Sequence, residues 1–439
     1  MATFAQIIKK KQKDWDAPHL MDGARAPRSA KLPFSSPLVN YCTYGGIPRN
    51  KITTFYGEYS GGKSTSAIDI CKNAYKIFVQ EYEAEVAELR EQIANGKKQL
   101  KGPLEDLLDR GPMKILYLDL EHSFDEEWAA TLGIKPEEIE IMQPPDIPAE
   151  DLLDTLQEII ETGEVGIIVL DSIPSLTAKQ ELEKSYGDKT VAAIAGPLTR
   201  FMRKIPPVLT RYKCTLLLIN QLRPDMNNPY ADNMPGGEAV KYYSSLMMKF
   251  HISDPVDILG QPLKKSAENP AGFIIEARIT KQKSAPNNRR VGTYYLISDQ
   301  GIREDFDFAN MAINQYGIIQ KSGGWYTMCN PFTGEPMEED DGRLVKVNGL
   351  AKVYSFLKDN TDYYDKLKTF ILNDINGVEQ PTDELSDEGI VEEEAPDAVA
   401  EILESSEEEE TTSNTKDKKS TKNLLQDFTS VQGESNEAK

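Results

Sequence analysis

The sequence predicts an α/β protein with a central, mainly parallel, twisted sheet flanked by helices, a small α+β C-terminal region and a disordered acidic tail. From Pro48 to about residue 300, short apolar runs alternate with helical patterns, which is typical of a parallel sheet covered on both faces. After residue 378 the composition turns to Glu, Asp, Ser and Thr, with too few large apolar groups to build a core. Strands are expected at Ile115–Leu118, Val165–Leu170, Thr215–Ile219 and Phe273–Ile279.

These patterns divide the 439 residues into four parts. They are an N-terminal helix and linker (1–30), a core (31–304), a small C-terminal domain (305–377) and the acidic tail (378–439). The first helix has Phe4, Ile7 and Ile8 on one side, so it docks either on its own core or on a neighbouring subunit. Residues 81–110 show apolar spacing typical of helices on both sides of Asn95-Gly96, which predicts a helical hairpin inserted in the core.

The net charge of −21 is distributed unevenly. Residues 379–410 hold 15 Asp or Glu and no Lys or Arg, and residues 411–439 hold 5 Lys and 4 acids, so residues 1–378 carry only −7. The overall charge therefore does not exclude nucleic acid as a partner of the folded part. Two interpretations of the tail stay open: a solubilising appendage, or a polyanionic arm that competes with DNA phosphates for basic surfaces.

The cysteines and the hydropathy indicate where the protein works. Cys42, Cys71, Cys214 and Cys329 are scattered and form no C-x-x-C pair, which predicts a reducing cytoplasm and no structural zinc. The N-terminus has no apolar signal segment, and no stretch approaches the about 18 apolar residues of a membrane span. We therefore expect a soluble cytoplasmic protein with no membrane partner.

The run Gly57-Glu58-Tyr59-Ser60-Gly61-Gly62-Lys63-Ser64 fits the pattern G-x-x-x-x-G-K-[ST] and directly follows the strand-like run Ile52–Tyr56. Backbone N–H groups in such a turn, with the N-terminus of the next helix, form a cradle for phosphates. Lys63 would reach the β and γ phosphates, and the Ser64 hydroxyl would ligate a Mg²⁺ ion bound to them. The motif predicts a nucleotide site; the alternative is a glycine-rich turn with an incidental lysine.

Polar residues follow three other predicted strands. Asp171 ends an apolar strand, and its carboxylate can hold the Mg²⁺ shell. Glu121 follows the strand that ends at Asp119 and is placed to polarise an attacking water, although it can also be a solvated strand-end acid. We expect His122 beside it to be a hydrogen-bonded packing residue. Gln221 ends the third strand, where its amide can bind a γ-phosphate and convert hydrolysis into a change of the following loop.

Seven separate blocks occur in the order and roles of bacterial RecA recombinases, and the resemblance spans about residues 30–330. The blocks are Tyr56–Thr65, Leu118–Asp125, Val169–Ser172, Met202–Ile205, Ile219–Arg223, Gly236–Tyr243 and Lys281–Lys283. Gly323–Tyr326 and the acidic end also resemble the C-terminal portion of RecA and of phage relatives of the UvsX kind. We therefore expect a phage-encoded recombinase to be the closest kin, with a RecA-like P-loop ATPase core.

The resemblance implies a DNA-dependent ATPase that forms helical filaments on single-stranded DNA and exchanges strands in homologous recombination and DNA repair. ATP and Mg²⁺ would be the cofactors, with duplex DNA as a second substrate and single-strand-binding and loader proteins as candidate partners. Glu121, Lys63 and Gln221 would be the catalytic residues, and Ser64 and Asp171 would hold the metal. The implied ATP-binding positions are Gly57, Glu58, Tyr59, Ser60, Gly61, Gly62, Lys63, Ser64, Thr65, Asp125, Trp128, Lys281 and Lys283.

Some of these positions carry more specific expectations from the resemblance. Asp125 and Trp128 fall where the family contacts adenine, with Trp128 in place of the usual tyrosine. Lys281 and Lys283 match the pair that reaches ATP bound to the adjacent subunit, which implies a nucleotide at a subunit interface. The two DNA-binding loops would be residues 183–190 and 222–235. The implied DNA-binding positions are Arg203, Arg223, Gly236 and Gly237.

The chain departs from the family pattern in three places. The segment 81–110 is much shorter in the usual member, and we expect it on the filament surface. Glu238 stands where a neutral asparagine is expected beside DNA, which puts that contact in doubt. Pro224 directly follows Arg223, so the second loop should be stiffer than usual.

Two other functions stay open. A hexameric replicative helicase shares the core and the phosphate loop, but the blocks around Glu121 and Lys281 favour the recombinase. A non-catalytic ATP-binding assembly factor is the third hypothesis, and the presence of Lys63, Ser64 and Asp171 argues against it.

Overall fold

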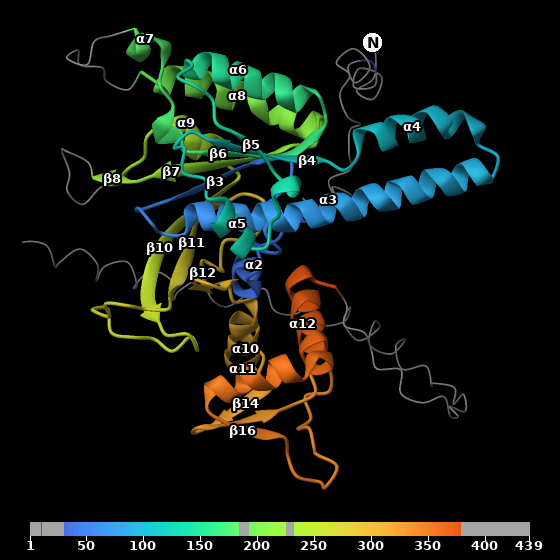
Figure 1. Ribbon diagram of the computed structural model, residues 1–439, viewed down its shortest axis with the longest axis vertical. Coiled ribbons are helices and arrows are strands. Elements are labelled where there is room, and N and C mark those ends of the chain that lie inside the picture. The colour runs from blue at the N-terminus through green and yellow to red at the C-terminus, as the bar shows by residue number, and fades with distance from the viewer. Residues whose placement is uncertain (1–9, 11–29, 184–192, 225–231, 379–439) are drawn as a thin grey trace, which may run out of the picture. The chain divides into compact units, whose positions relative to one another are not determined.

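The computed structural model describes residues 10, 30–183, 193–224 and 232–378. Among these residues a nine-stranded sheet has the order β13-β12-β11-β10-β3-β7-β6-β4-β5, in which the strands from β10 to β5 pair in parallel (Figure 1). The mainly parallel sheet was therefore predicted correctly. The strands are β3 (Ile52–Gly57), β4 (Lys114–Asp119), β5 (Glu140–Met142), β6 (Val165–Asp171), β7 (Thr215–Gln221), β10 (Leu246–Val256), β11 (Gly272–Gln282), β12 (Val291–Ile297) and β13 (Gly301–Ile302).

The strands at one edge of the sheet pair antiparallel. β11 pairs antiparallel with β10, β12 with β11, and β13 with β12. The predicted strand Phe273–Ile279 lies in β11, so it does not continue the parallel order. An apolar run indicates burial but not direction, because direction depends on the connection between strands.

The central strands are buried on both faces because successive side chains point to opposite sides of the sheet. In β6, Ile167 and Val169 belong to one core cluster and Ile168 and Leu170 to the other. Figure 1 shows α3 on one side of the sheet and α6 and α8 on the other. The helices that cover the faces are α2 (Pro37–Thr43), α3 (Lys63–Ala94), α5 (Glu126–Thr131), α6 (Ala149–Glu161), α8 (Ala195–Arg211) and α9 (Glu238–Tyr243).

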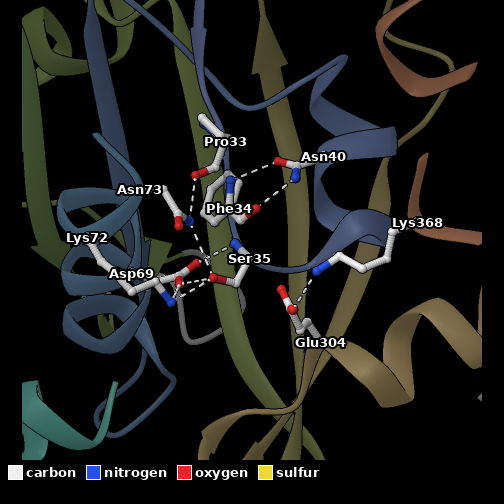
Figure 2. A network of polar contacts seen from close by, with 9 residues as sticks. All are labelled: Pro33, Phe34, Ser35, Asn40, Asp69, Lys72, Asn73, Glu304 and Lys368. Atoms are coloured by element: carbon white, nitrogen blue, oxygen red, sulfur yellow. Dashed lines mark hydrogen bonds and ion pairs between the residues drawn. The ribbon is translucent and has the colours of Figure 1, made fainter. Parts of the chain in front are cut away.

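A polar network fastens the segment before α2 to α3 (Figure 2). The backbone N–H and the hydroxyl of Ser35 both donate to the Asp69 carboxylate, at 2.7 and 2.5 Å. Lys72 donates to Ser35 Oγ at 2.8 Å and pairs with Asp69 at 2.8 Å. Asn73 Nδ2 donates to the carbonyl of Pro33 at 3.0 Å. Because Asp69 is buried on the helix that begins at Lys63, these contacts hold that helix against the start of the core.

Residues 81–110 do not form two separate new helices. The first arm is the continuation of α3, and the second arm is α4 (Lys101–Arg110), which lies beside it and points away from the sheet (Figure 1). Helix α3 ends before Asn95, and Gly96 has a φ of +98°, a conformation that favours glycine. Val86 and Leu107 are the buried side chains of the two arms. Each arm therefore packs mainly on the other.

A third core cluster lies in the C-terminal part of the described chain. Helix α10 (Glu304–Asn314) leads from the sheet into this part, and its Lys368–Glu304 ion pair at 2.8 Å joins it to α12. Phe306 stacks on Tyr354 with ring centroids 4.1 Å apart. The remaining elements are a three-stranded sheet of β14 (Ile319–Ser322), β15 (Trp325–Met328) and β16 (Lys346–Asn348), with α11 (Leu350–Asp359) and α12 (Thr361–Asn376).

Several predictions fall on residues that the structure does not describe. These are the N-terminal helix, almost all of the first DNA-binding loop at 184–190, the centre of the second at 225–231, and the acidic tail from 379. Within the described ranges, none of the helices combines the length and the apolar character that a membrane crossing needs.

Candidate nucleotide site

The phosphate-binding motif lies between the end of β3 and the start of α3, as its position in the sequence predicts. Its glycines are also required by what lies beneath the loop. A Cβ on Gly57 would stand 2.2 Å from the carbonyl oxygen of Phe250, and one on Gly62 would stand 2.9 Å from the hydroxyl of Tyr294. Both glycines have positive φ, +152° and +88°. The loop therefore packs closely on β10 and β12, and any larger residue would lift it.

Lys63 is the first residue of α3 and is buried. Its ammonium group donates to the carbonyl oxygen of Glu58 in the same loop at 2.5 Å. Burial lowers the pKa of Lys63, and the carboxylates of Asp171, Glu121 and Glu58 oppose that shift. The loop thus holds a buried cation at the N-terminus of α3, and a cation beside a helix N-terminus favours phosphate binding.

Ser64 and Asp171 come together at the predicted metal position. Ser64 Oγ donates to Asp171 Oδ2 at 2.8 Å, from the first turn of α3 to the last residue of β6. The Tyr117 hydroxyl donates to the same oxygen at 2.6 Å. Burial raises the pKa of Asp171, and the hydrogen bonds from Tyr117 and Ser64 oppose the rise. A hydroxyl and a carboxylate are hard oxygen donors, so this pair fits a Mg²⁺ ion bound to phosphates.

Glu121 and Gln221 are in direct contact although they are far apart in the sequence. Gln221 Nε2 donates to Glu121 Oε1 at 2.7 Å. The Ser172 hydroxyl donates to the same oxygen of Glu121. The contact arises because β6 lies between β4 and β7 in the sheet and the carboxyl ends of all three strands meet at one edge. The predicted water-polarising acid and the predicted switch therefore form one unit.

Asp119 fixes the segment that follows β4. Its Oδ2 accepts from the backbone N–H of Phe124 and from Gln143 Nε2, both at 2.9 Å. His122 in this segment is exposed and has a φ of +52°, so the prediction that it is a hydrogen-bonded packing residue was wrong. The turn at His122 sends the chain from Glu121 back towards α5.

Asp125 and Trp128 have clear structural roles. The Asp125 carboxylate accepts from the backbone N–H of Trp128 at 2.9 Å and caps the N-terminus of α5. Trp128 is half-buried and packs on the core cluster beneath α3. Their role at adenine stays a prediction, because helix capping explains Asp125 and core packing explains Trp128 without a bound adenine.

Lys281 and Lys283 lie away from the chain's own phosphate loop. Lys281 pairs with Met247, which pairs with Thr54 near the start of β3, whereas the phosphate loop follows Gly57 at its end. Both ammonium groups donate to the carbonyl of Tyr242 at the end of α9, at 3.0 and 2.8 Å. Burial, with the nearby charge of Lys283, lowers the pKa of Lys281 to about 8.

The implied DNA-binding positions lie on three different parts of the fold: α8, the strand β8 and the turn before α9. Gly236 and Gly237 have positive φ, +91° and +75°, and a Cβ on Gly236 would stand 2.7 Å from Leu198. Arg203 lies on the exposed side of α8. Arg223 belongs to the short strand β8 (Arg223–Pro224), which pairs with β9 (Asp232–Asn233), and its side chain lies outside the description.

The charge of Glu238 at the start of α9 is paired with Lys241 at 2.7 Å. This pair offsets the negative charge that sets the chain apart from the family pattern at this position.

Comparison with known proteins agrees with this geometry. A family model described as the RecA N-terminal domain matches residues 107–303. Protein RecA of Bacteroides thetaiotaomicron is 28% identical over 336 residues, which cover 76% of this chain and 83% of that protein. The chain is therefore similar to RecA proteins over most of its length. Protein RecA of Pseudarthrobacter chlorophenolicus is also 28% identical, over 88% of this chain and 94% of its own length.

A third RecA-family relative, Protein RecA of Thermus aquaticus, is 28% identical over 75% of this chain and 80% of that protein. Among solved structures, the crystal structure of the RadB recombinase matches with 15% identity and a TM-score of 0.40, over 62% of this chain and 98% of that one. That similarity is too low to support an argument. The family-model match begins at residue 107, after the phosphate loop, so it does not test the loop itself.

Proposed function

We propose that this chain is an ATP-dependent DNA recombinase that forms helical filaments on single-stranded DNA and exchanges strands between homologous DNAs in recombination and repair. The observation that carries the proposal is the hydrogen bond from Gln221 to Glu121, 2.7 Å, at the same sheet edge as Lys63, Ser64 and Asp171. It joins a candidate hydrolytic group to the residue from which a candidate DNA-binding loop begins.

Hydrolysis would use the residues at this edge in separate roles. Lys63 and the loop from Gly57 to Thr65 would bind the phosphates of ATP, and Ser64 and Asp171 would hold Mg²⁺, which neutralises charge on the β and γ oxygens. Glu121 would orient a water molecule and accept its proton. Ser172 and Gln221 hold the Glu121 carboxylate in place.

Gln221 would couple this reaction to DNA. Its amide has one acceptor, the Glu121 carboxylate, that a γ-phosphate can replace. The neighbouring residues tie the same point to the loop: Leu222 N–H donates to the Gly57 carbonyl at 3.2 Å, and Asn220 Nδ2 donates to the Pro235 carbonyl at 2.8 Å. Both ends of the segment 222–235 are therefore hydrogen-bonded to residues beside the phosphate loop or Gln221. A shift of the Gln221 side chain towards a γ-phosphate would then move both ends together.

The DNA contacts would be to phosphates. Arg203 and Arg223 would supply positive charge, and Gly237, which is half-buried, has no side chain to keep a phosphate from its backbone. Such contacts give sequence-independent, salt-sensitive binding, so base pairing between strands would read the sequence.

The filament would place ATP between subunits. Lys281 and Lys283 lie at the level of the start of β3, away from their own phosphate loop, which supports a role at the nucleotide of an adjacent subunit. Asp125 and Trp128 would contact the adenine. A heterologous contact that does not close would give a helix of subunits, with ATP stabilising each joint.

The test is ATP hydrolysis with and without single-stranded DNA, followed by strand exchange between a circular single strand and a homologous linear duplex. We expect DNA-stimulated hydrolysis and joint molecules. Hydrolysis with unwinding and no exchange would assign the chain to the helicases. Neither activity would leave a non-catalytic ATP-binding assembly factor.

A further inference from the structure

Tyr117 carries a polar group that its strand does not need for packing. Its neighbours in β4, Ile115, Leu116 and Leu118, are apolar and buried, and the Tyr117 side chain itself is only 2% exposed. A buried tyrosine hydroxyl requires a hydrogen-bond partner. Here the partner is Asp171 Oδ2, at 2.6 Å.

The contact has a defined origin in the fold. Strands β4 and β6 are parallel neighbours, and Tyr117 pairs with Val169 two residues before Asp119 pairs with Asp171. Tyr117 and Val169 point to the sheet face that α3 covers, and α3 carries Ser64 in its first turn. The phenol therefore approaches Asp171 from β4, and the Ser64 hydroxyl approaches it from α3.

Two donors on one carboxylate oxygen fix the plane of the carboxyl group. Ser64 Oγ and the Tyr117 hydroxyl donate to Oδ2 at 2.8 and 2.6 Å, so the two lone pairs of this oxygen are both used. No hydrogen bond from the described residues reaches Asp171 Oδ1. The arrangement holds one oxygen still and leaves the other for a ligand.

We propose that Tyr117 is a positioning residue for the Mg²⁺–nucleotide complex: its hydroxyl holds Asp171 in the orientation in which this carboxylate and Ser64 together bind the metal. The inference rests on the proposed nucleotide site. Outer-shell hydrogen bonds to metal-binding groups typically change metal affinity by about 10-fold to 100-fold. Without the phenol, Asp171 would keep only its contact with Ser64 and could rotate.

The test is Tyr117→Phe, which removes one oxygen atom and keeps the ring contact with Phe124, whose centroid is 5.1 Å away. The probe is a fluorescent ATP analogue, titrated with Mg²⁺ on the full chain. We expect the Mg²⁺ concentration at half-maximal binding to rise about 10-fold, while nucleotide binding without Mg²⁺ stays unchanged. The matched control is Tyr363→Phe, which removes a buried hydroxyl bonded to the Cys329 carbonyl at 3.0 Å, far from the site in the C-terminal part.

The outcomes separate the two proposals. An unchanged Mg²⁺ midpoint in Tyr117→Phe, with normal Mg²⁺-dependent binding by the wild type, overturns the role of Tyr117 alone. Absence of Mg²⁺-dependent binding by the wild type overturns the nucleotide site and this inference together. A double-mutant cycle adds a second test: in an Asp171→Asn background Tyr117→Phe should have no further effect, and an equal loss in both backgrounds means that the hydroxyl acts only on general stability.

Discussion

The two halves of α3 lie in opposite environments. The first half, from Lys63 to Phe78, holds nearly all of the buried residues of the helix, because it lies against the sheet and directly follows the phosphate loop. In the second half only Val86 is buried, and the second half packs mainly on the other arm of the hairpin. The first half therefore packs on several elements of the sheet at once, whereas the second half packs mainly on the other arm of the hairpin. Substitutions should have large functional effects near the sheet and small ones in the hairpin.

The largest effect is expected at the first residue of α3. Lys63→Ala removes the buried cation of the phosphate loop, so ATP binding should weaken by about 100-fold and ATP-dependent filaments should disappear. Binding is measured with a fluorescent ATP analogue, and filaments by electron microscopy. Lys76→Ala, an exposed lysine on the same half of the helix, is the control and should bind as the wild type does. Normal filaments from Lys63→Ala would remove the assignment of the phosphate loop.

The next effect is expected at the end of β4. Glu121→Gln keeps an amide oxygen that can accept from Ser172 and Gln221, but it cannot accept a proton from water. Hydrolysis should fall by about 10²-fold to 10⁴-fold while ATP and DNA binding persist. Steady-state phosphate release and filter binding measure the two properties. Glu126→Gln, an exposed acid in the first turn of α5, serves as the control, and wild-type turnover in Glu121→Gln would argue against its role.

These two sites could be predicted from the sequence for a simple reason. The carboxyl ends of parallel strands meet at one edge of a sheet, so a phosphate loop after one strand and polar residues after others must come close. Glu121 and Gln221 follow this rule, since each comes at or just after the end of a parallel strand and the two side chains are in contact. The direction of β11 could not be predicted, because an apolar run does not specify it.

The supporting residues were missed for a different reason. Tyr117 lies in an apolar strand, where an aromatic ring is most simply core, and its contact with Asp171 depends on the register of β4 against β6. Ser172 depends on the same register. The need for glycine at position 57 is also tertiary, since a side chain there would clash with the carbonyl oxygen of Phe250, almost 200 residues away in the sequence. The one available signal was a tyrosine in the strand that precedes Glu121, next to the strand that ends at the proposed metal-binding acid Asp171.

A smaller effect is expected at Lys281, which lies away from the phosphate loop of its own chain. Its pKa of about 8 means that the positive charge is present below that pH and is lost as the pH rises through it. Between pH 7 and pH 9 the charged fraction falls from roughly nine tenths to roughly one tenth. If this charge reaches the nucleotide of a neighbouring subunit, ATP-dependent assembly should weaken over that range, measured by light scattering.

Lys281→Arg is the matched variant, because an arginine stays charged throughout this range. Its assembly should be independent of pH between 7 and 9. The same pH dependence in the wild type and in Lys281→Arg would mean that another group is responsible.

The smallest functional effect is expected in the hairpin, where the difference between the two halves of α3 is tested directly. Leu107→Ala removes the buried side chain of α4, and truncation of a buried leucine costs about 2 kcal/mol or more. That loss should be confined to the hairpin, because the Arg110–Glu85 pair at 3.8 Å lies between its two arms and the Arg49–Glu81 pair joins only its base to the core. Hydrogen exchange should rise in α4 and in α3 beyond residue 80, while ATP hydrolysis stays within about two-fold of wild type.

A comparable substitution in the first half, Ile70→Ala, should raise exchange across the sheet as well, since Ile70 is fully buried in the core cluster there. If Leu107→Ala instead lowered hydrolysis as strongly as Ile70→Ala, α3 would transmit disorder along its whole length, and the hairpin would be part of the nucleotide site's support.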